Sequence, residues 1–347
     1  MEQKQKKEER YHNIDGLRAC AAIGILMMHV LANGGYALEG FIFQRVIPSF
    51  TDLVFLFMMI SSFAMCCGYY ERMISGNINL GQFYKKRFSK VWPFFAALTI
   101  MDIVVSPSVA SLYEAFANLT LCFGLLPNAN ISVIGVGWTL GVIFVFYLLF
   151  PFFCFLLSDC KRGWLAFFAA LLMNIACRRY FFDDAHMLDD FMPRSNFMYC
   201  AVYFVAGGLV WRYREKMDQN WSGVVALAAA AVGAAAYFAV GSKMLVTLVL
   251  YVAVLIYAIS RKNKKGLLNN RIVGFISGIS MEVYLCHMVV FRVIEKMGWL
   301  GLFEHELLSY LATVTITIAG SVIFAVCAKM LLAKAGACLE KMYIRVK

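Results

Sequence analysis

The chain has 347 residues, of which 62% are hydrophobic and only 15% are charged. Soluble domains carry roughly 25% charged residues, so this chain has too few to cover a water-facing surface. Its net charge of +11 does not indicate a nucleic-acid partner, because membrane proteins retain basic residues on the cytoplasmic side. The composition therefore predicts one helical membrane domain in a lipid bilayer, without a soluble catalytic domain and without nucleic acid.

Apolar stretches of about 17–25 residues recur along the chain, and each is long enough to cross the hydrocarbon as a helix. We expect an all-α integral membrane protein with about ten transmembrane helices, at 14–33, 50–70, 91–106, 137–157, 163–178, 195–211, 221–240, 244–260, 272–294 and 307–328. These spans define a cytoplasmic segment 1–13, a transmembrane domain 14–328 and a basic tail 329–347. The cysteines lack metal-type spacing, so no metal is expected.

An eleventh apolar stretch, 110–126, is short and contains Glu114 and Asn118. If it does not cross and the N-terminus is inside, 24 of the 32 Lys and Arg lie in cytoplasmic segments and 6 lie outside. The positive-inside rule favours this asymmetry, whereas an eleventh crossing would move two basic clusters outside. We therefore predict that both termini are cytoplasmic and that 110–126 is a re-entrant or protein-buried outer segment.

The first span carries ionisable residues, which are costly in hydrocarbon and are therefore functional candidates. Asp15 and Arg18 are three residues apart and can pair on one helix face. Arg18 and His29 are eleven apart, so their side chains share a face about 16 Å apart along the axis. The structural alternative is an arginine that reaches the headgroups and a hydrogen-bonded core histidine.

A second histidine, His287, lies about fifteen residues into its own span, at a depth similar to that of His29. Glu282 and Arg292 stand five residues on either side of it. Two histidines at one depth can converge in a cavity, where a neutral imidazole accepts and returns protons near pH 7. Unrelated polar contacts remain the alternative for His287.

A basic cluster precedes the third span, at the cytoplasmic boundary. It consists of Lys85, Lys86, Arg87 and Lys90. The cluster suits a topology anchor on anionic lipid. It also suits a phosphate-binding mouth for a cytoplasmic cofactor, and both roles are compatible.

Five motifs in order resemble the membrane acyltransferase-3 family. Asp15-Gly16-Leu17-Arg18 with His29 resembles its R-x10-H signature, and Trp138-Thr139-Leu140 its W-x-L block. The remaining three are residues 57–63, 84–93 and 279–287, which resemble the second-helix, basic and late Y-L-x-H blocks. Ser62 replaces a family glycine, Lys90 a usual arginine, and Ile143 stands where many members have a glutamate.

This resemblance implies a ten-helix enzyme of a bacterial cell membrane that takes acyl groups from cytoplasmic acyl-CoA, usually acetyl-CoA. The acceptor is expected to be a hydroxyl or amine of an envelope glycan or lipid-linked sugar. It implies that His29 is catalytic, with Arg18 as its partner, and that Arg87 and Lys90 form the basic pair. Asp15 and His287 complete the candidate catalytic set, and a homodimer stays open.

Two alternatives accompany this interpretation. His29 can act as a general base or form a covalent acyl-histidine, and His287 can orient the acceptor or stabilise an oxyanion. The family branch without the glutamate also includes proteins associated with serine export. The rival hypothesis is therefore a transporter of a small polar molecule such as an amino acid, in which the same buried charges bind substrate or protons.

Overall fold

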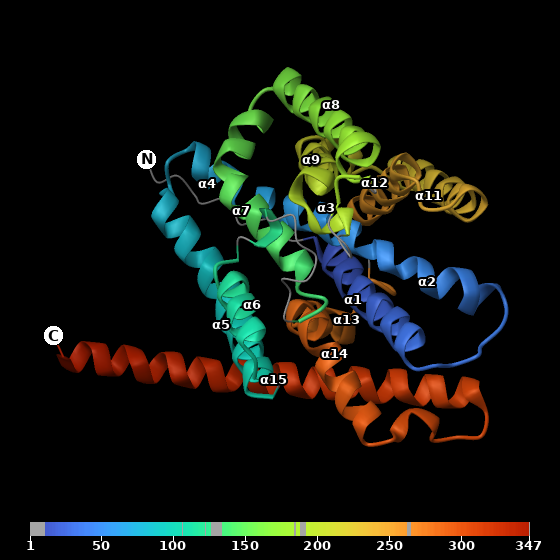
Figure 1. The fold of residues 1–347 in the computed structure, drawn as a ribbon. Helices are drawn as coiled ribbons and strands as arrows, with labels where there is room; N and C mark the ends of the chain where they lie inside the picture. The colour runs from blue at the N-terminus through green and yellow to red at the C-terminus, as the bar shows by residue number, and fades with distance from the viewer. Residues whose placement is uncertain are drawn as a thin grey trace.

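The computed structural model describes residues 11–105, 107–121, 123–125, 134–183, 185–187, 192–261 and 265–346. These parts of the chain are almost entirely helical (Figure 1). The longer helices are α1 (His12–Asn33), α3 (Leu53–Met65), α5 (Leu80–Val105), α6 (Val109–Leu119), α7 (Trp138–Leu157), α8 (Cys160–Ala176), α9 (Phe197–Arg212), α11 (Asn220–Val240), α12 (Met244–Ser260), α13 (Arg271–Gly278), α14 (Ser280–Lys296) and α15 (Glu306–Val346). Short turns include η1 (Ile42–Val46), α2 (Ile47–Ser49), η2 (Phe50–Asp52), η3 (Cys66–Tyr70), α4 (Glu71–Ile74), η4 (Phe123–Leu125), η6 (Cys177–Phe181), η7 (Pro193–Ser195), α10 (Arg214–Met217) and η8 (Trp299–Gly301).

The all-helical, multi-pass membrane fold is confirmed by these elements. Each of the ten predicted spans coincides with helical structure, and six helices in the described part of the chain are long and apolar enough to cross a bilayer. A seventh is added if α13 and α14 count as one bent span, while α9 and α12 are shorter apolar helices. The count of ten crossings and the cytoplasmic termini stay predictions.

The core of the bundle is built around α1, which packs against α3, α12, α13, α14 and α15. Figure 1 shows α1 in the middle, with α8 and α11 at the edge. Most of the apolar stretch of α1 is buried, whereas little of α8 or α11 is buried. Helices that are apolar all round suit this arrangement, since their outer faces meet hydrocarbon instead of water.

Several helix starts are capped by a polar side chain immediately before the apolar stretch. Asp159 accepts a hydrogen bond from the Arg162 amide, and Asn270 accepts one from the Val273 amide. Such caps satisfy amide groups that would otherwise lack partners at the helix end. They make the starts of α8 and α13 local properties of the sequence.

Glycines bring α9 into close contact with its neighbours. A Cβ atom at Gly207 would lie 2.3 Å from the Met59 carbonyl oxygen on α3. A Cβ atom at Gly208 would lie 2.4 Å from the Phe153 ring on α7. Small residues at such interfaces let membrane helices pack backbone to backbone, which fixes the separation of α3, α7 and α9.

Three expected elements differ in the structure. The expected straight span 272–294 is broken, with α13 and α14 bent by 75° at Ile279. Within 110–126, α6 is an 11-residue helix that packs on α5, with Ala115 and Asn118 buried and Leu112 and Phe116 exposed. Only one face of this helix is covered by protein, and a re-entrant course for 110–126 stays a prediction. The expected tail after 328 continues the 41-residue α15, which Figure 1 shows as a long rod along one side.

Candidate functional site

A cavity of about 660 Å³ lies between one end of α1, α5 and α7 and the break between α13 and α14. Its lining contains five basic and two acidic side chains, namely Arg18, Arg72, Arg87, Lys90, Lys329, Asp15 and Glu282. The excess of positive charge in a recess favours a polyanionic ligand. Two members of the predicted basic cluster, Arg87 and Lys90, belong to this lining.

Two of its charges come from the first turns of α1. Arg18 Nη1 lies 3.4 Å from Asp15 Oδ1, so the pair expected from their spacing is present. Gly16 stands between them because the chain at Leu268 passes directly over α1. A Cβ atom at Gly16 would lie 2.0 Å from the Leu268 carbonyl oxygen. Glycine at this position therefore positions the loop before α13 against the charged end of α1.

The predicted basic cluster is divided by the helical period of α5. Arg87 and Lys90 line the cavity, whereas Lys85 and Lys86 are exposed and are not part of its lining. Residues three apart share a face of a helix, while neighbours one or two apart do not. The structure thus places two members of the cluster at the cavity and two outside its lining, and phosphate binding by the four residues stays a prediction.

The guanidinium of Arg87 is held by aromatic side chains. Its Nη2 donates to the Tyr69 hydroxyl at 2.5 Å, and its carbon lies 4.5 Å from the centre of the Tyr69 ring. The same guanidinium carbon lies 5.8 Å from the centre of the Tyr147 ring. Arginine stacked on aromatic rings keeps its charge and is oriented for planar, bidentate contacts with phosphate.

The break between α13 and α14 forms another wall of the cavity. Ser277, Gly278 and Ser280 line it at this point. Lys329 of α15 crosses to the break, where its Nζ lies 2.9 Å from Glu282 Oε1 and 3.3 Å from the Gly278 carbonyl oxygen. A straight helix over 272–294 would leave no such wall, so the bend contributes directly to the site.

The cavity is lined at its inner end by Thr139 and Tyr284. Thr139 Oγ1 donates to the Tyr284 hydroxyl oxygen at 3.0 Å, and that hydroxyl donates to the Val136 carbonyl at 3.1 Å. Both residues belong to motifs that resemble those of the family, although the motifs by themselves indicate no role for either residue. Their contact joins the start of α7 to α14.

The two candidate histidines meet one helical turn beyond Tyr284. The ring centroids of His29 and His287 lie 5.3 Å apart, with an angle of 41° between the planes. His287 is 0% exposed, and its Nδ1 lies 2.7 Å from the Tyr284 carbonyl oxygen. A carbonyl only accepts, so Nδ1 carries the hydrogen and Nε2 is the basic nitrogen of a neutral ring. Within the described residues Nε2 has no hydrogen-bond partner.

His29 is half-buried and is not part of the cavity lining. It lies eleven residues from Arg18 on α1, about 16 Å along the helix axis. The structure therefore separates the predicted catalytic residues into two layers, with Asp15 and Arg18 at the charged cavity and His29 with His287 beyond it. Tyr284 lies between the layers.

Several residues of the cavity carry no functional signal of their own in the sequence. Tyr69 lies in a predicted membrane span, and Arg72 and Lys329 fit the topology signals of the cytoplasmic side. Their common sequence signal is position, because each stands at or beyond the predicted cytoplasmic end of a span. Spacing alone does not distinguish these residues from ordinary anchors.

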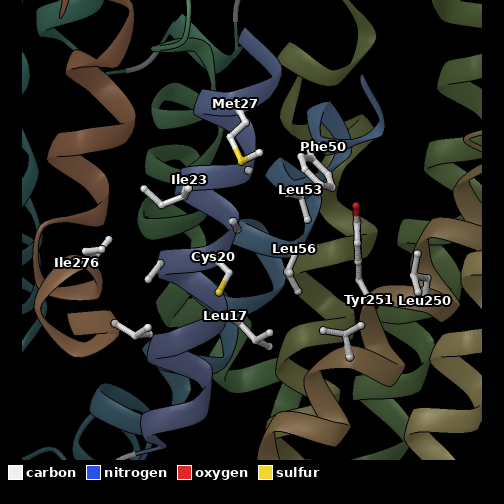
Figure 2. Close-up of a pocket in the computed structure, with 15 residues that line it drawn as sticks. Leu17, Cys20, Ile23, Met27, Phe50, Leu53, Leu56, Leu250, Tyr251 and Ile276 are labelled. Atoms are coloured by element: carbon white, nitrogen blue, oxygen red, sulfur yellow. The ribbon is translucent and has the colours of Figure 1, made fainter. Parts of the chain in front are cut away.

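A second hollow, of about 600 Å³, lies on the other side of α1. Figure 2 shows its lining, which comes from α1, α3, α12 and α13 and includes Cys20, Met27, Leu56 and Tyr251. Cys20, Ile23 and Met27, which line it from α1, lie on the face of the helix opposite Arg18 and His29. This groove is almost wholly apolar. It borders α1, the helix that carries Arg18 and His29, but none of the candidate site residues lines it.

Residues 11–326 match the acyltransferase-3 family model, described as an acyltransferase domain. No curated protein and no solved structure matches the chain. The family match covers the bundle from α1 to about the middle of α15, and with it the histidine pair and most of the charged cavity. The chain thus belongs to the acyltransferase-3 family of membrane acyltransferases.

Proposed function

We propose that this protein transfers an acetyl group from cytoplasmic acetyl-CoA to a hydroxyl of a cell-envelope glycan or lipid-linked sugar at the cell membrane. The observation that carries the proposal is the position of the His29–His287 pair, one helical turn beyond a basic cavity. An acyltransferase needs a proton acceptor at the point where its donor and its acceptor meet. The histidine pair lies beyond the inner end of the basic cavity, which is the proposed binding site of the donor.

The residues of the cavity fit the polyphosphate part of an acyl-CoA. Arg18, Arg87 and Lys90 supply donors from two helices, and Tyr69 orients the Arg87 guanidinium. When bound, the thioester supplies an acyl carbon whose C–S bond breaks as a C–O bond to the acceptor forms. The cavity residues hold the phosphates by charge-assisted hydrogen bonds, which are shorter and stronger than neutral ones.

The histidines supply the proton transfer. His29 accepts the proton of the attacking hydroxyl and returns it to the departing thiolate, so the products are an ester and a thiol. His287 positions the ring of His29, because its own orientation is set by the Tyr284 carbonyl. The Tyr284–Thr139 contact keeps that carbonyl and the wall of the cavity in place.

The test uses purified protein with radiolabelled acetyl-CoA, comparing His29→Ala and His29→Gln with the parent. Both variants should still bind acetyl-CoA, because Arg87 and Lys90 are untouched. Transfer should fall by at least about 10²-fold, the usual contribution of a positioned base. His186, an exposed histidine paired with Asp183, provides the matched control, and His186→Gln should transfer normally.

Three results would contradict the proposal or change its mechanism. Normal turnover by His29→Gln would make His29 a structural contact, since glutamine cannot take up a proton. Label on the protein that is labile to acid and to neutral hydroxylamine, and that disappears in His29→Ala, would favour the acyl-histidine mechanism. Uptake of a small solute into vesicles without acyl donor, lost in both variants, would favour the transporter.

A further inference from the structure

Arg194 lies at the other end of the site from the basic cavity. It belongs to η7, immediately before α9, and sequence analysis treated it only as one of the basic residues outside. Its Nη1 donates to Thr51 Oγ1 at 2.7 Å, and its guanidinium carbon lies 5.4 Å from the centre of the Trp138 ring. The side chain is half-buried.

Among the described residues, Arg194 forms no ion pair with a carboxylate. Its other side-chain contact is the thioether of Met192, at 3.5 Å, which is a weak acceptor. A guanidinium carries five N–H donors, and Thr51 and Met192 together use two. A partly desolvated cation with spare donors is stabilised by an anion that enters from outside the protein.

The position of Arg194 relates it to the reaction centre. Trp138 begins α7, while the residues that follow it along the helix, from Thr139 to Tyr147, line the basic cavity. Thr139, the residue that follows Trp138, donates to the hydroxyl of Tyr284, which lies one helical turn from His287. The histidine layer is thus approached from the cavity side by Arg18 and Arg87, and from the opposite side by Arg194.

We infer that Arg194 binds an anionic group, a carboxylate or a phosphate, on the acceptor and so places the acceptor hydroxyl at His29. The inference rests on the proposed function, because it assigns the two ends of the site to two substrates. The polyphosphate donor matches the end with five basic residues, which leaves the end with Arg194 for the acceptor. Trp138 fixes the guanidinium plane, and that plane matches the flat carboxylate or the oxygen pair of a phosphate.

A labelling experiment tests the anion site without requiring activity. Thr51→Cys is introduced after the exposed Cys20, Cys160 and Cys327 are changed to Ser. Its rates with anionic 2-sulfonatoethyl and cationic 2-(trimethylammonio)ethyl methanethiosulfonate are then compared. Arg194→Gln should lower the anionic-to-cationic rate ratio about tenfold, because a unit charge is removed beside the thiol.

Arg194→Lys should preserve the ratio, and the exposed Arg179 supplies the control Arg179→Gln, which should also leave it unchanged. Protection by glucuronate, by glycerol phosphate and by glucose is measured at the same position. An anion that protects in the parent and not in Arg194→Gln identifies carboxylate or phosphate as the group bound. An unchanged ratio, a thiol that neither reagent reaches, or equal protection by glucose would overturn the inference.

The protecting anion is finally offered as acceptor with radiolabelled acetyl-CoA. Arg194→Gln should raise the acceptor KM at least about tenfold, a larger change than the change in kcat. A fall in kcat at constant KM would instead place Arg194 on the transition state and refute an acceptor-binding role. No transfer by the parent protein would count against the proposed function, while the labelling ratios would still decide whether Arg194 binds anions.

Discussion

Replacement of Arg87 separates a true binding site from a topology anchor. Arg87 faces the basic cavity, whereas Lys85 and Lys86 belong to the same cluster but are exposed outside its lining. We expect Arg87→Ala to weaken acyl-CoA binding and Lys85→Ala with Lys86→Ala to leave it nearly unchanged. The three basic residues are adjacent on α5, so the variants differ mainly in whether the replaced side chain lines the cavity.

The expected size follows from the contacts of the guanidinium. Hydrogen bonds to a charged group contribute about 1.5–3 kcal/mol net, and some of this is recovered by water in the mutant, so we expect a loss of about 1–3 kcal/mol. This corresponds to a Kd about 5- to 150-fold higher. The exposed lysines are screened by solvent, and their removal should change Kd about twofold or less.

Arg87→Lys should give an intermediate loss. Lysine keeps the charge but loses the planar fork and the stacking on Tyr69. Tyr69→Phe should cost less than Arg87→Ala, because the ring remains beneath the guanidinium while the 2.5 Å hydrogen bond is removed.

Binding of acetyl-CoA and of dephospho-CoA to purified protein is measured by calorimetry at two salt concentrations. A monodisperse elution profile in detergent establishes that each variant is folded. The reasoning would be refuted if folded Arg87→Ala bound acetyl-CoA as tightly as the parent. It would also fail if the two exposed lysines contributed as much as Arg87.

Two further predictions concern packing and topology. Gly207→Ala should destabilise the protein by about 1–3 kcal/mol, seen as a lower Tm in detergent, because the new methyl would meet the Met59 carbonyl oxygen at 2.3 Å. Gly274→Ala, where a Cβ would meet nothing within 4 Å, is the control, and equal losses in both would contradict the packing argument. For topology, a cysteine at the exposed His186 should react with an impermeant reagent added outside the cell, while one at the exposed Leu267 should not. Labelling at Leu267 from outside would mean that 110–126 crosses after all.

Features that depend on neighbours in the chain were predictable. The apolar lengths of the spans identified the helices, because each helix satisfies its own backbone hydrogen bonds within the segment. The Asp15–Arg18 contact follows from a spacing of three residues on one helix. The caps at Asp159 and Asn270 are likewise set within four residues.

The bend at Ile279 was not predictable from hydropathy, because the whole of 272–294 is apolar enough for a straight span. The sequence of the basic cluster before the third span also does not indicate which of its members face the cavity. The helical period alone separates Arg87 and Lys90 from Lys85 and Lys86, but the direction of the cavity is set by the other helices around it.

The sequence by itself determined that His29 shares a helix face with Arg18 and that the chain lies in a membrane. Only the tertiary structure decided that His29 meets His287, that Lys329 reaches Glu282, and that Arg194 lies beside Trp138. Each of these contacts joins residues more than forty positions apart. Their formation depends on how several helices pack at once, and helix spacing along the chain does not encode that packing.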